Sequence, residues 1–250
     1  MELAEYRESE TEQARTNDLM ALLPKNIETV LDIGARDGFI SKLLADRVRS
    51  VTALDLSRPK IDDIRILCVK GDVTDLDFND GSFNLVMCTE VLEHLPGAML
   101  GNACDELSRV SNRYLLIGVP FMQDLRLDRT TCPRCGIKNP PWGHVNSFDT
   151  DRLLRLFPLY YLAQKSFVGV TSAATNFLSC LLMDLAGNPY GTYMQEESCV
   201  HCGAMFSSPP KRTLIEKIFT KAAVYAAKAQ APFIKPHPKW IHVLLEKRTV

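Results

Sequence analysis

Residues 30–40, VLDIGARDGFI, decide the fold. The β-branched and apolar run at 29–33 predicts a strand, and the periodic apolar positions of 38–48 predict a helix directly after it. Gly34 and Gly38 lie in the turn between them, so that backbone N–H groups and a helix N-terminus face whatever binds there. Such a turn alone is weak evidence for a ligand, because close packing of a helix on a strand also demands glycine.

The alternation of strands and helices continues on both sides of this turn. Further strands are predicted at 51–56, 64–70, 83–88, 113–121, 160–170 and 240–246, and further helices at 9–22, 98–110, 150–157, 172–186 and 213–230. This order is typical of βαβ units around a parallel sheet. We therefore expect an α/β protein with a Rossmann-like, doubly wound, seven-stranded and mainly parallel sheet whose last strand is antiparallel. Thr150 is the expected N-cap of the helix at 150–157.

The composition excludes several classes of protein. The 250 residues are 46% hydrophobic and 24% charged, which is typical of an ordinary folded protein and not of a disordered or fibrous one. The formal net charge is -1, so no bulk attraction to nucleic acid is expected. The acidic N-terminal stretch lacks a signal-peptide core, and no apolar run approaches the ~20 residues of a membrane span. We expect a cytoplasmic protein without a membrane span.

Acidic residues follow three successive predicted strands. Asp32 ends the first strand, Asp55 ends the second 23 positions later, and Asp72 follows the third in GDVTD. An open α/β sheet presents the carboxylate at the end of its second strand to ribose hydroxyls. Asp72 is placed to accept a hydrogen bond from a ring amino group. The three acids therefore indicate a ligand that carries a ribose and an amino-bearing ring.

With these motifs the sequence resembles the class I S-adenosylmethionine-dependent methyltransferases, closely over about residues 25–121. The family's glycine-rich motif matches LDIGARDG, with Arg36 in place of its middle glycine, and its fourth-strand motif matches FNLVMCTEVLEHL at 83–95. The resemblance implies S-adenosylmethionine as the cofactor, bound by Asp32, Gly34, Ala35, Gly38, Asp55, Leu56, Asp72, Val73, Thr89 and Glu90. An NAD fingerprint fits less well, because it includes neither the GDVTD acid nor the E-V-L-E-H-L segment.

Three residues are candidates for acid–base catalysis. Methyl transfer needs an in-line approach of the acceptor, and a base within hydrogen-bond reach assists when the acceptor is a hydroxyl. His144, in WGHVNSFD, is the first candidate because related enzymes carry a His-x-x-x-Phe element beside the acceptor pocket; a structural cap or a zinc ligand is the alternative role. Glu93 and His94 are the other candidates, with orientation of the turn after the fourth strand as their alternative role.

The eight cysteines divide into two groups. Four lie singly in apolar or helical runs, where we expect core residues: Cys68, Cys88, Cys104 and Cys180. The others form two C-x-x-C units that each precede a glycine, as in a zinc knuckle: Cys132, Cys135, Cys199 and Cys202. Together they predict a closed, structural Zn²⁺ site, with disulfides or redox-active thiols as the alternatives. The 63 residues between the pairs exceed the usual spacing, so the pairs meet only if the fold brings them together.

We expect both cysteine pairs to lie in an insertion within a single methyltransferase domain, residues 1–250. Residues 122–147 and 187–210 are expected to form a small zinc-stapled lid over the acceptor site, and 211–250 to supply a C-terminal helix and the last strand. That helix carries lysines on one face: Lys217, Lys221 and Lys228. A solvated surface is the simpler explanation of these lysines, and peripheral contact with an anionic membrane or a polyanion is the alternative.

The predicted function is transfer of a methyl group from S-adenosylmethionine to a small-molecule or glycan-type acceptor, at oxygen. The segment after the fourth strand lacks the Asn/Asp-Pro-Pro-Tyr/Phe signature of relatives that act on base or amide nitrogen. Two alternatives stay open. An RNA or protein methyltransferase would hold a macromolecule with the zinc lid and the basic tail, and a non-catalytic, zinc-stabilised binding scaffold would bind no cofactor.

Overall fold

The computed structural model describes residue 7 and residues 9–193, 195, 197–206, 208–209 and 211–248. Contacts between residues divide the chain into two compact units. Unit 1 comprises Met1–Phe121, Phe148–Gly169 and Pro238–Val250, and unit 2 comprises Met122–Ser147 and Val170–His237. The helices predicted at 172–186 and 213–230 therefore fall in unit 2, together with both cysteine pairs.

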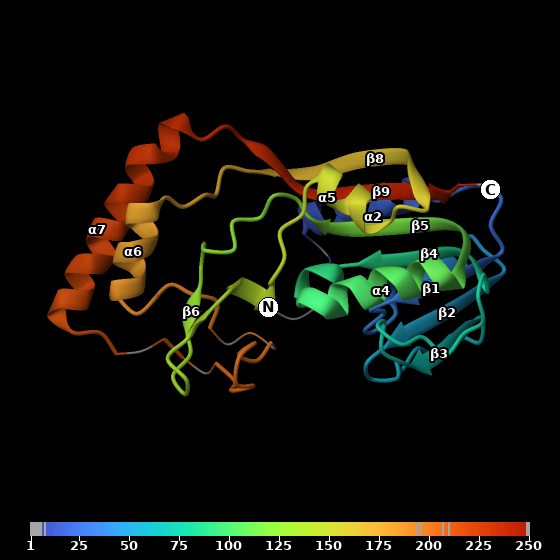
Figure 1. Cartoon of the computed structure of the whole chain (residues 1–250), viewed down its shortest axis with the longest axis horizontal. Coiled ribbons are helices and arrows are strands. Elements are labelled where there is room, and N and C mark those ends of the chain that lie inside the picture. The colour runs from blue at the N-terminus through green and yellow to red at the C-terminus, as the bar shows by residue number, and fades with distance from the viewer. Residues whose placement is uncertain are drawn as a thin grey trace. The chain divides into compact units, whose positions relative to one another are not determined.

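Unit 1 is built on a seven-stranded sheet (Figure 1). Its strands are β1 (Thr29–Ile33), β2 (Ser50–Asp55), β3 (Ile66–Lys70), β4 (Phe83–Thr89), β5 (Ser111–Pro120), β8 (Tyr160–Thr171) and β9 (His237–Lys247). The strand order is β3-β2-β1-β4-β5-β9-β8; the pairs among β1 to β5 are parallel, and β9 is antiparallel to β5. The predicted Rossmann-like, mainly parallel sheet with an antiparallel last strand is confirmed.

Helices cover both faces of this sheet. The helices α2 (Glu10–Ala21) and α3 (Phe39–Ala45) contribute to the same core as Val30 of β1. On the opposite face, α4 (Gly97–Val110) and α5 (Thr150–Leu156) contribute to the core that contains Leu31 and Ile33. Burial on both faces explains the almost continuous apolar strands, as in other parallel sheets. Three of the four single cysteines are buried, as predicted, and Cys68 is half-buried.

Side-chain caps set the beginnings of two of these helices, α2 and α5. The hydroxyl of Ser9 accepts a hydrogen bond from the N–H of Glu12 and caps α2. The prediction that Thr150 caps α5 is wrong, because the carboxylate of Asp149 accepts from the N–H of Arg152 at 2.7 Å. Asp149 is at least as good an acceptor as a threonine hydroxyl, so the helix begins one residue earlier than the predicted cap allows.

The described residues of unit 2 form two α-helices and a small hairpin. The helices are α6 (Phe177–Leu185) and α7 (Leu214–Gln230), and the hairpin pairs β6 (Thr130–Thr131) with β7 (Lys138–Asn139). The sequence does not predict the hairpin, because two-residue strands carry no periodicity. Single turns of 3-10 helix follow β4 as η1 (Leu92–His94), precede α5 as η2 (Pro141–Gly143) and follow α7 as η3 (Ala231–Phe233). None of the helices in the described part of the chain is long and apolar enough to cross a membrane.

Candidate functional site

The turn between β1 and α3 has an unusual backbone. Gly34, Arg36 and Gly38 have φ angles of 76°, 47° and 80°. A Cβ atom on Gly34 would lie 2.6 Å from the side chain of Val91, and one on Gly38 would lie 2.3 Å from that of Ile61, so both positions demand glycine. Arg36 adopts a left-handed conformation that favours glycine, at a cost of roughly 1–2 kcal/mol.

Asp55, the last residue of β2, is fixed to this turn. Its Oδ2 accepts a hydrogen bond from the N–H of Arg36 at 2.9 Å. The N–H groups of Gly34 and Ala35 both donate to the carbonyl of Leu54, at 2.9 and 3.1 Å. Because a carboxylate accepts several hydrogen bonds, Asp55 can also accept hydrogen bonds from hydroxyl groups of a ligand.

Asp72, after β3, is oriented by its neighbour. Its Oδ1 accepts from both the N–H and the hydroxyl of Thr74, at 2.9 and 2.8 Å. Val73 is buried, whereas Leu56, the residue after Asp55, is 68% exposed. An exposed leucine and two carboxylates at neighbouring strand ends offer both apolar and hydrogen-bonding contacts to a ligand.

Asp32 differs from the other two acids because it is buried. Its Oδ2 accepts from the hydroxyl of Ser41 at 2.6 Å, which links β1 to α3. Burial, opposed by the Ser41 hydrogen bond and reinforced by the charge of Asp55, raises the pKa of Asp32 to about 7. At neutral pH this carboxyl group is therefore partly protonated in the unliganded protein.

We expect Asp32 to make the unliganded protein less stable as the pH rises from about 4 to about 7. The folded-state pKa lies above the ordinary 3.8, so the folded state binds the proton more tightly and loses this advantage on deprotonation. Asp32→Asn keeps an acceptor for Ser41 and removes the titration. The unfolding free energy of the variant minus that of the parent should be roughly 2–3 kcal/mol larger at pH 8 than at pH 5. Urea unfolding measures this gain, and an unchanged difference at the two pH values would contradict the assignment.

The end of β4 meets α2 in an ion network. Glu90 has a φ of 56°, and its N–H donates to the carbonyl of Gly118 at 2.9 Å. The Glu90 carboxylate lies 3.4 Å from a guanidinium nitrogen of Arg15, which two hydrogen bonds of 2.6 and 2.8 Å hold against Glu12. Partial desolvation raises the pKa of Glu90, and the charge of Arg15 opposes that shift. The sequence predicts Glu90 but misses Arg15 and Glu12, although both lie on the periodic buried face of α2.

A second polar group that the sequence misses lies beside Thr89. His242 of β9 is fully buried, and its Nδ1 lies 2.6 Å from Oδ2 of Asp18. Burial lowers the pKa of His242, and Asp18 offsets part of this shift. Gly118 pairs with both Thr89 and His242, and a Cβ atom on it would lie within 3.1 Å of each side chain. Gly118 therefore makes room for the imidazole next to the end of β4.

Glu93 and His94 lie in η1, directly after this network. Glu93 is fully buried, and burial together with the charge of Glu90 raises its pKa well above the ordinary range. Neither of its carboxyl oxygens has a hydrogen-bond partner among the described residues. Burial lowers the pKa of His94. Burial thus favours the protonated acid at Glu93 and the neutral imidazole at His94, and their catalytic roles stay predictions.

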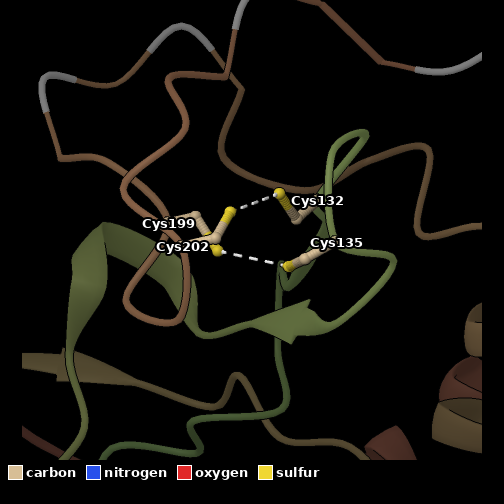
Figure 2. A group of neighbouring side chains, drawn as sticks. All are labelled: Cys132, Cys135, Cys199 and Cys202. Atoms are coloured by element: carbon tan, nitrogen blue, oxygen red, sulfur yellow. Dashed lines mark hydrogen bonds between the residues drawn. The ribbon is translucent and has the colours of Figure 1, made fainter.

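Both cysteine pairs meet in unit 2, where Figure 2 shows their sulfur atoms facing one another. The Sγ atoms of Cys132 and Cys202 are 3.6 Å apart, those of Cys135 and Cys199 are 3.8 Å apart, and all four lie within 4.8 Å of one another. Four sulfurs bonded to a tetrahedral Zn²⁺ at ~2.3 Å lie about 3.8 Å apart. A disulfide instead holds its sulfurs ~2.0 Å apart, and none of the four cysteines is in one. The spacing therefore fits a four-coordinate metal.

The same turn shapes each pair. The N–H of Gly136 donates to the carbonyl of Cys132, and the N–H of Gly203 donates to that of Cys199, both at 2.9 Å. The two glycines have φ angles of 71° and 70°, the conformation that a knuckle needs after its second ligand. Burial alone would raise the pKa of Cys132, but the N–H groups after it and the nearby thiols lower it to about 6. The backbone thus favours a thiolate at this position.

Two histidines lie close to the cysteines in the sequence, and their side chains have different environments. His201 lies between Cys199 and Cys202 in the sequence, and its side chain is exposed. His144 is buried, and its Nδ1 lies 2.7 Å from Oε1 of Gln123. The four sulfurs form a complete tetrahedral set without either histidine.

Part of the chain matches known proteins in sequence. Residues 31–113 match the methyltransferase domain family. The ubiquinone biosynthesis O-methyltransferase of Pseudomonas paraeruginosa is 30% identical over 101 residues, which cover 36% of this chain and 43% of that protein. The match therefore spans less than half the length of this curated relative.

Solved structures resemble nearly the whole chain at low sequence identity. The N-methyltransferase NodS from Bradyrhizobium japonicum, in complex with S-adenosyl-L-homocysteine, matches 98% of this chain and 91% of its own, with a TM-score of 0.55 and 12% identity. The 1,6-didemethyltoxoflavin-N1-methyltransferase of Burkholderia thailandensis matches 98% of this chain and 81% of its own, with a TM-score of 0.55 and 13% identity. These likenesses show the fold. Within this fold, residues 31–113, from β1 to the beginning of β5, are the part that matches the methyltransferase domain family.

Proposed function

We propose that the chain transfers a methyl group from S-adenosylmethionine to a small-molecule or glycan-type acceptor, at an oxygen atom. The observation that carries the cofactor assignment is the series of acids at the ends of β1, β2 and β3 beside a left-handed turn. Asp55 would accept hydrogen bonds from the ribose hydroxyls, and Asp72 would accept one from the amino group of the ring. Asp32, through Ser41, would hold the turn in place. The small residues of the turn would allow a close approach of the cofactor: Gly34, Ala35 and Gly38.

The remaining predicted residues fit the other parts of the cofactor. Leu56 and Val73 would flank the adenine ring. Thr89 and Glu90 would line the methionine end, where Glu90 can pair with an ammonium group and Arg15 with a carboxylate. When bound, S-adenosylmethionine supplies an electrophilic methyl group on a sulfonium centre. The part of the protein is to hold the acceptor atom in line with that group.

The assignment to an oxygen acceptor has separate support. The CTEVLEHL segment lacks the Asn/Asp-Pro-Pro-Tyr/Phe signature, and the relative with 30% identity is named an O-methyltransferase. A hydroxyl acceptor benefits from a base, for which His144 is the first candidate. The structural relatives NodS and the toxoflavin enzyme are named N-methyltransferases, so a screen of acceptor classes with labelled S-adenosylmethionine has to include amines as well as hydroxyls.

We expect His144→Ala to retain its affinity for S-adenosylmethionine and to lower kcat about 10²–10⁴-fold, because it removes the general base. The measurements are label transfer to the acceptor found in the screen and calorimetric titration of the cofactor. His201→Ala is the matched control, since it removes an exposed histidine of the same unit. Unchanged turnover in His144→Ala would exclude His144 as the base and leave Glu93 and His94 as candidates.

The two alternative functions predict different results. An RNA or protein methyltransferase would lose acceptor affinity steeply as salt is added, whereas a neutral small acceptor would not. A non-catalytic scaffold would bind no S-adenosylmethionine at all. The salt dependence of turnover and the cofactor titration therefore separate the three functions.

We further propose that the cysteine cluster binds one structural Zn²⁺. The S···S distances and the paired glycine turns support this assignment. Four thiolates leave no open coordination position, so the ion would cross-link two segments and take no part in methyl transfer. A reducing cytoplasm would keep the four thiols available as ligands.

A further inference from the structure

Helices α6 and α7 lie side by side in unit 2 as an antiparallel pair (Figure 1). The Nδ2 of Asn176, the N-cap of α6, donates to the carbonyl of Ala226 near the end of α7 at 3.0 Å. The Nε2 of Gln230 donates to the carbonyl of Ala174, also at 3.0 Å. The residues that the two helices bury are all small: Ser179, Cys180, Thr220 and Ala223. Four larger apolar residues of the pair are half-buried: Leu182, Met183, Phe219 and Val224.

Eight of the larger apolar side chains of the same helices are exposed instead. Their exposed fractions range from 43% to 79%: Phe177, Leu178, Leu181 and Leu185 on α6, and Leu214, Ile215, Ile218 and Tyr225 on α7. On each helix they recur with the helical period, so they form one stripe along it. A helix pair in water ordinarily buries its large apolar residues and exposes its small and polar ones. This reversed pattern indicates a surface that another apolar phase or molecule covers.

Basic side chains accompany the stripe on α7. Lys217, Lys221 and Lys228 are exposed and lie along one line of the helix beside the apolar residues. Between positions 211 and 237 there are six lysines and arginines and a single acid, Glu216, which is engaged in the capping box of α7. On α6, Asp184 forms ion pairs with two basic side chains. The surface therefore combines large apolar groups with positive charge.

We propose that the exposed apolar stripe of α7 with its three lysines, together with the exposed stripe of α6, docks on an anionic lipid bilayer. Interfacial helices place their apolar side chains at the boundary between headgroups and acyl chains. Lysines extend from such helices to the lipid phosphates. A second copy of this chain would bring the same positive charge, and a nucleic acid would leave the apolar stripes uncovered. The docking is peripheral, and it does not depend on the acceptor or on catalysis.

The test is sedimentation of the full-length chain with vesicles of phosphatidylcholine, with and without phosphatidylglycerol. We expect the vesicle-bound fraction to rise at least about tenfold when the anionic lipid is present and to fall as salt is added. Binding to neither vesicle, or equal binding to both, would overturn the proposal.

Two pairs of substitutions locate the surface. Leu181→Gln with Ile218→Gln removes apolar contacts, and Lys217→Glu with Lys221→Glu reverses the charge; each should reduce binding about tenfold or more. Lys25→Glu with Lys60→Glu makes the same charge change at exposed lysines of unit 1 and should leave binding unchanged. All six positions are exposed, and circular dichroism checks that the variants are folded. Equal loss of vesicle binding in the control would overturn the proposal. So would a parent protein that binds no vesicle but forms a dimer, if Leu181→Gln with Ile218→Gln dissociates that dimer.

Discussion

Asp55→Ala is expected to lower the affinity for S-adenosylmethionine about 100-fold or more. The substitution removes hydrogen bonds between a carboxylate and the ribose hydroxyls, each of which contributes about 1.5–3 kcal/mol. It also frees the N–H of Arg36, which Asp55 holds at 2.9 Å in a left-handed turn, so the shape of the turn changes as well. Asp55→Asn keeps a neutral acceptor at the same place and should therefore lose less, about tenfold. Calorimetric titration measures both variants.

The matched control for Asp55 is Asp105→Ala. Asp105 is an exposed acid on α4, so the control changes the net charge by the same amount without touching the strand ends. We expect it to bind the cofactor as the parent does. Parent-like affinity in a folded Asp55→Ala would contradict the assignment of the ribose site.

The double substitution Cys132→Ser with Cys199→Ser is expected to abolish metal binding and to unfold the region around the cysteines. It removes one ligand from each knuckle. Structural zinc contributes about 10–16 kcal/mol of binding free energy in zinc-finger peptides, and that energy is folding energy. Among the described residues, the apolar cluster at this site has three buried members, Cys132, Cys199 and Phe206, which is too small a core to replace the ion. Elemental analysis should find one equivalent of zinc in the parent and none in the variant.

Hydrogen exchange locates the region that unfolds when zinc binding is lost. In the double variant, amides of 130–139 and 197–206 should exchange much faster, while amides of β1 to β5 keep their protection. Cys68→Ser is the control, because Cys68 is a half-buried cysteine on β3, and it should keep both the zinc and the exchange pattern. A parent protein that is unchanged after chelation, or that contains disulfides between these cysteines, would contradict the zinc assignment.

Much of unit 1 could be predicted because its signals are local. Each of the seven predicted strands overlaps an observed one, and the strand at 29–33 has the predicted bounds. Once the strands are parallel, their carboxyl ends share one edge, and this alone places Asp55 and Asp72 beside the turn at Gly34. The knuckle turns were equally predictable, because a glycine directly after each C-x-x-C pair determines them.

The partners of these residues could not be predicted, because they come from distant segments. Asp18 meets His242 across 224 positions, and nothing local to either residue indicates the other. Arg15 and Glu90 likewise belong to elements whose packing only the fold determines. Periodicity predicts α6 and α7 as helices, but it does not tell which face is buried, so their exposed apolar stripes appear only in the structure.

We expect unit 1 to bind S-adenosylmethionine at the carboxyl ends of β1 to β4. The most direct test is calorimetric titration of the purified chain with S-adenosylmethionine, together with a thermal unfolding measurement. We predict saturable binding at one site and stabilisation of about 2.7 kcal/mol when the cofactor is present at 100 times its Kd. The absence of both a heat of binding and a thermal shift at saturating cofactor would contradict this assignment.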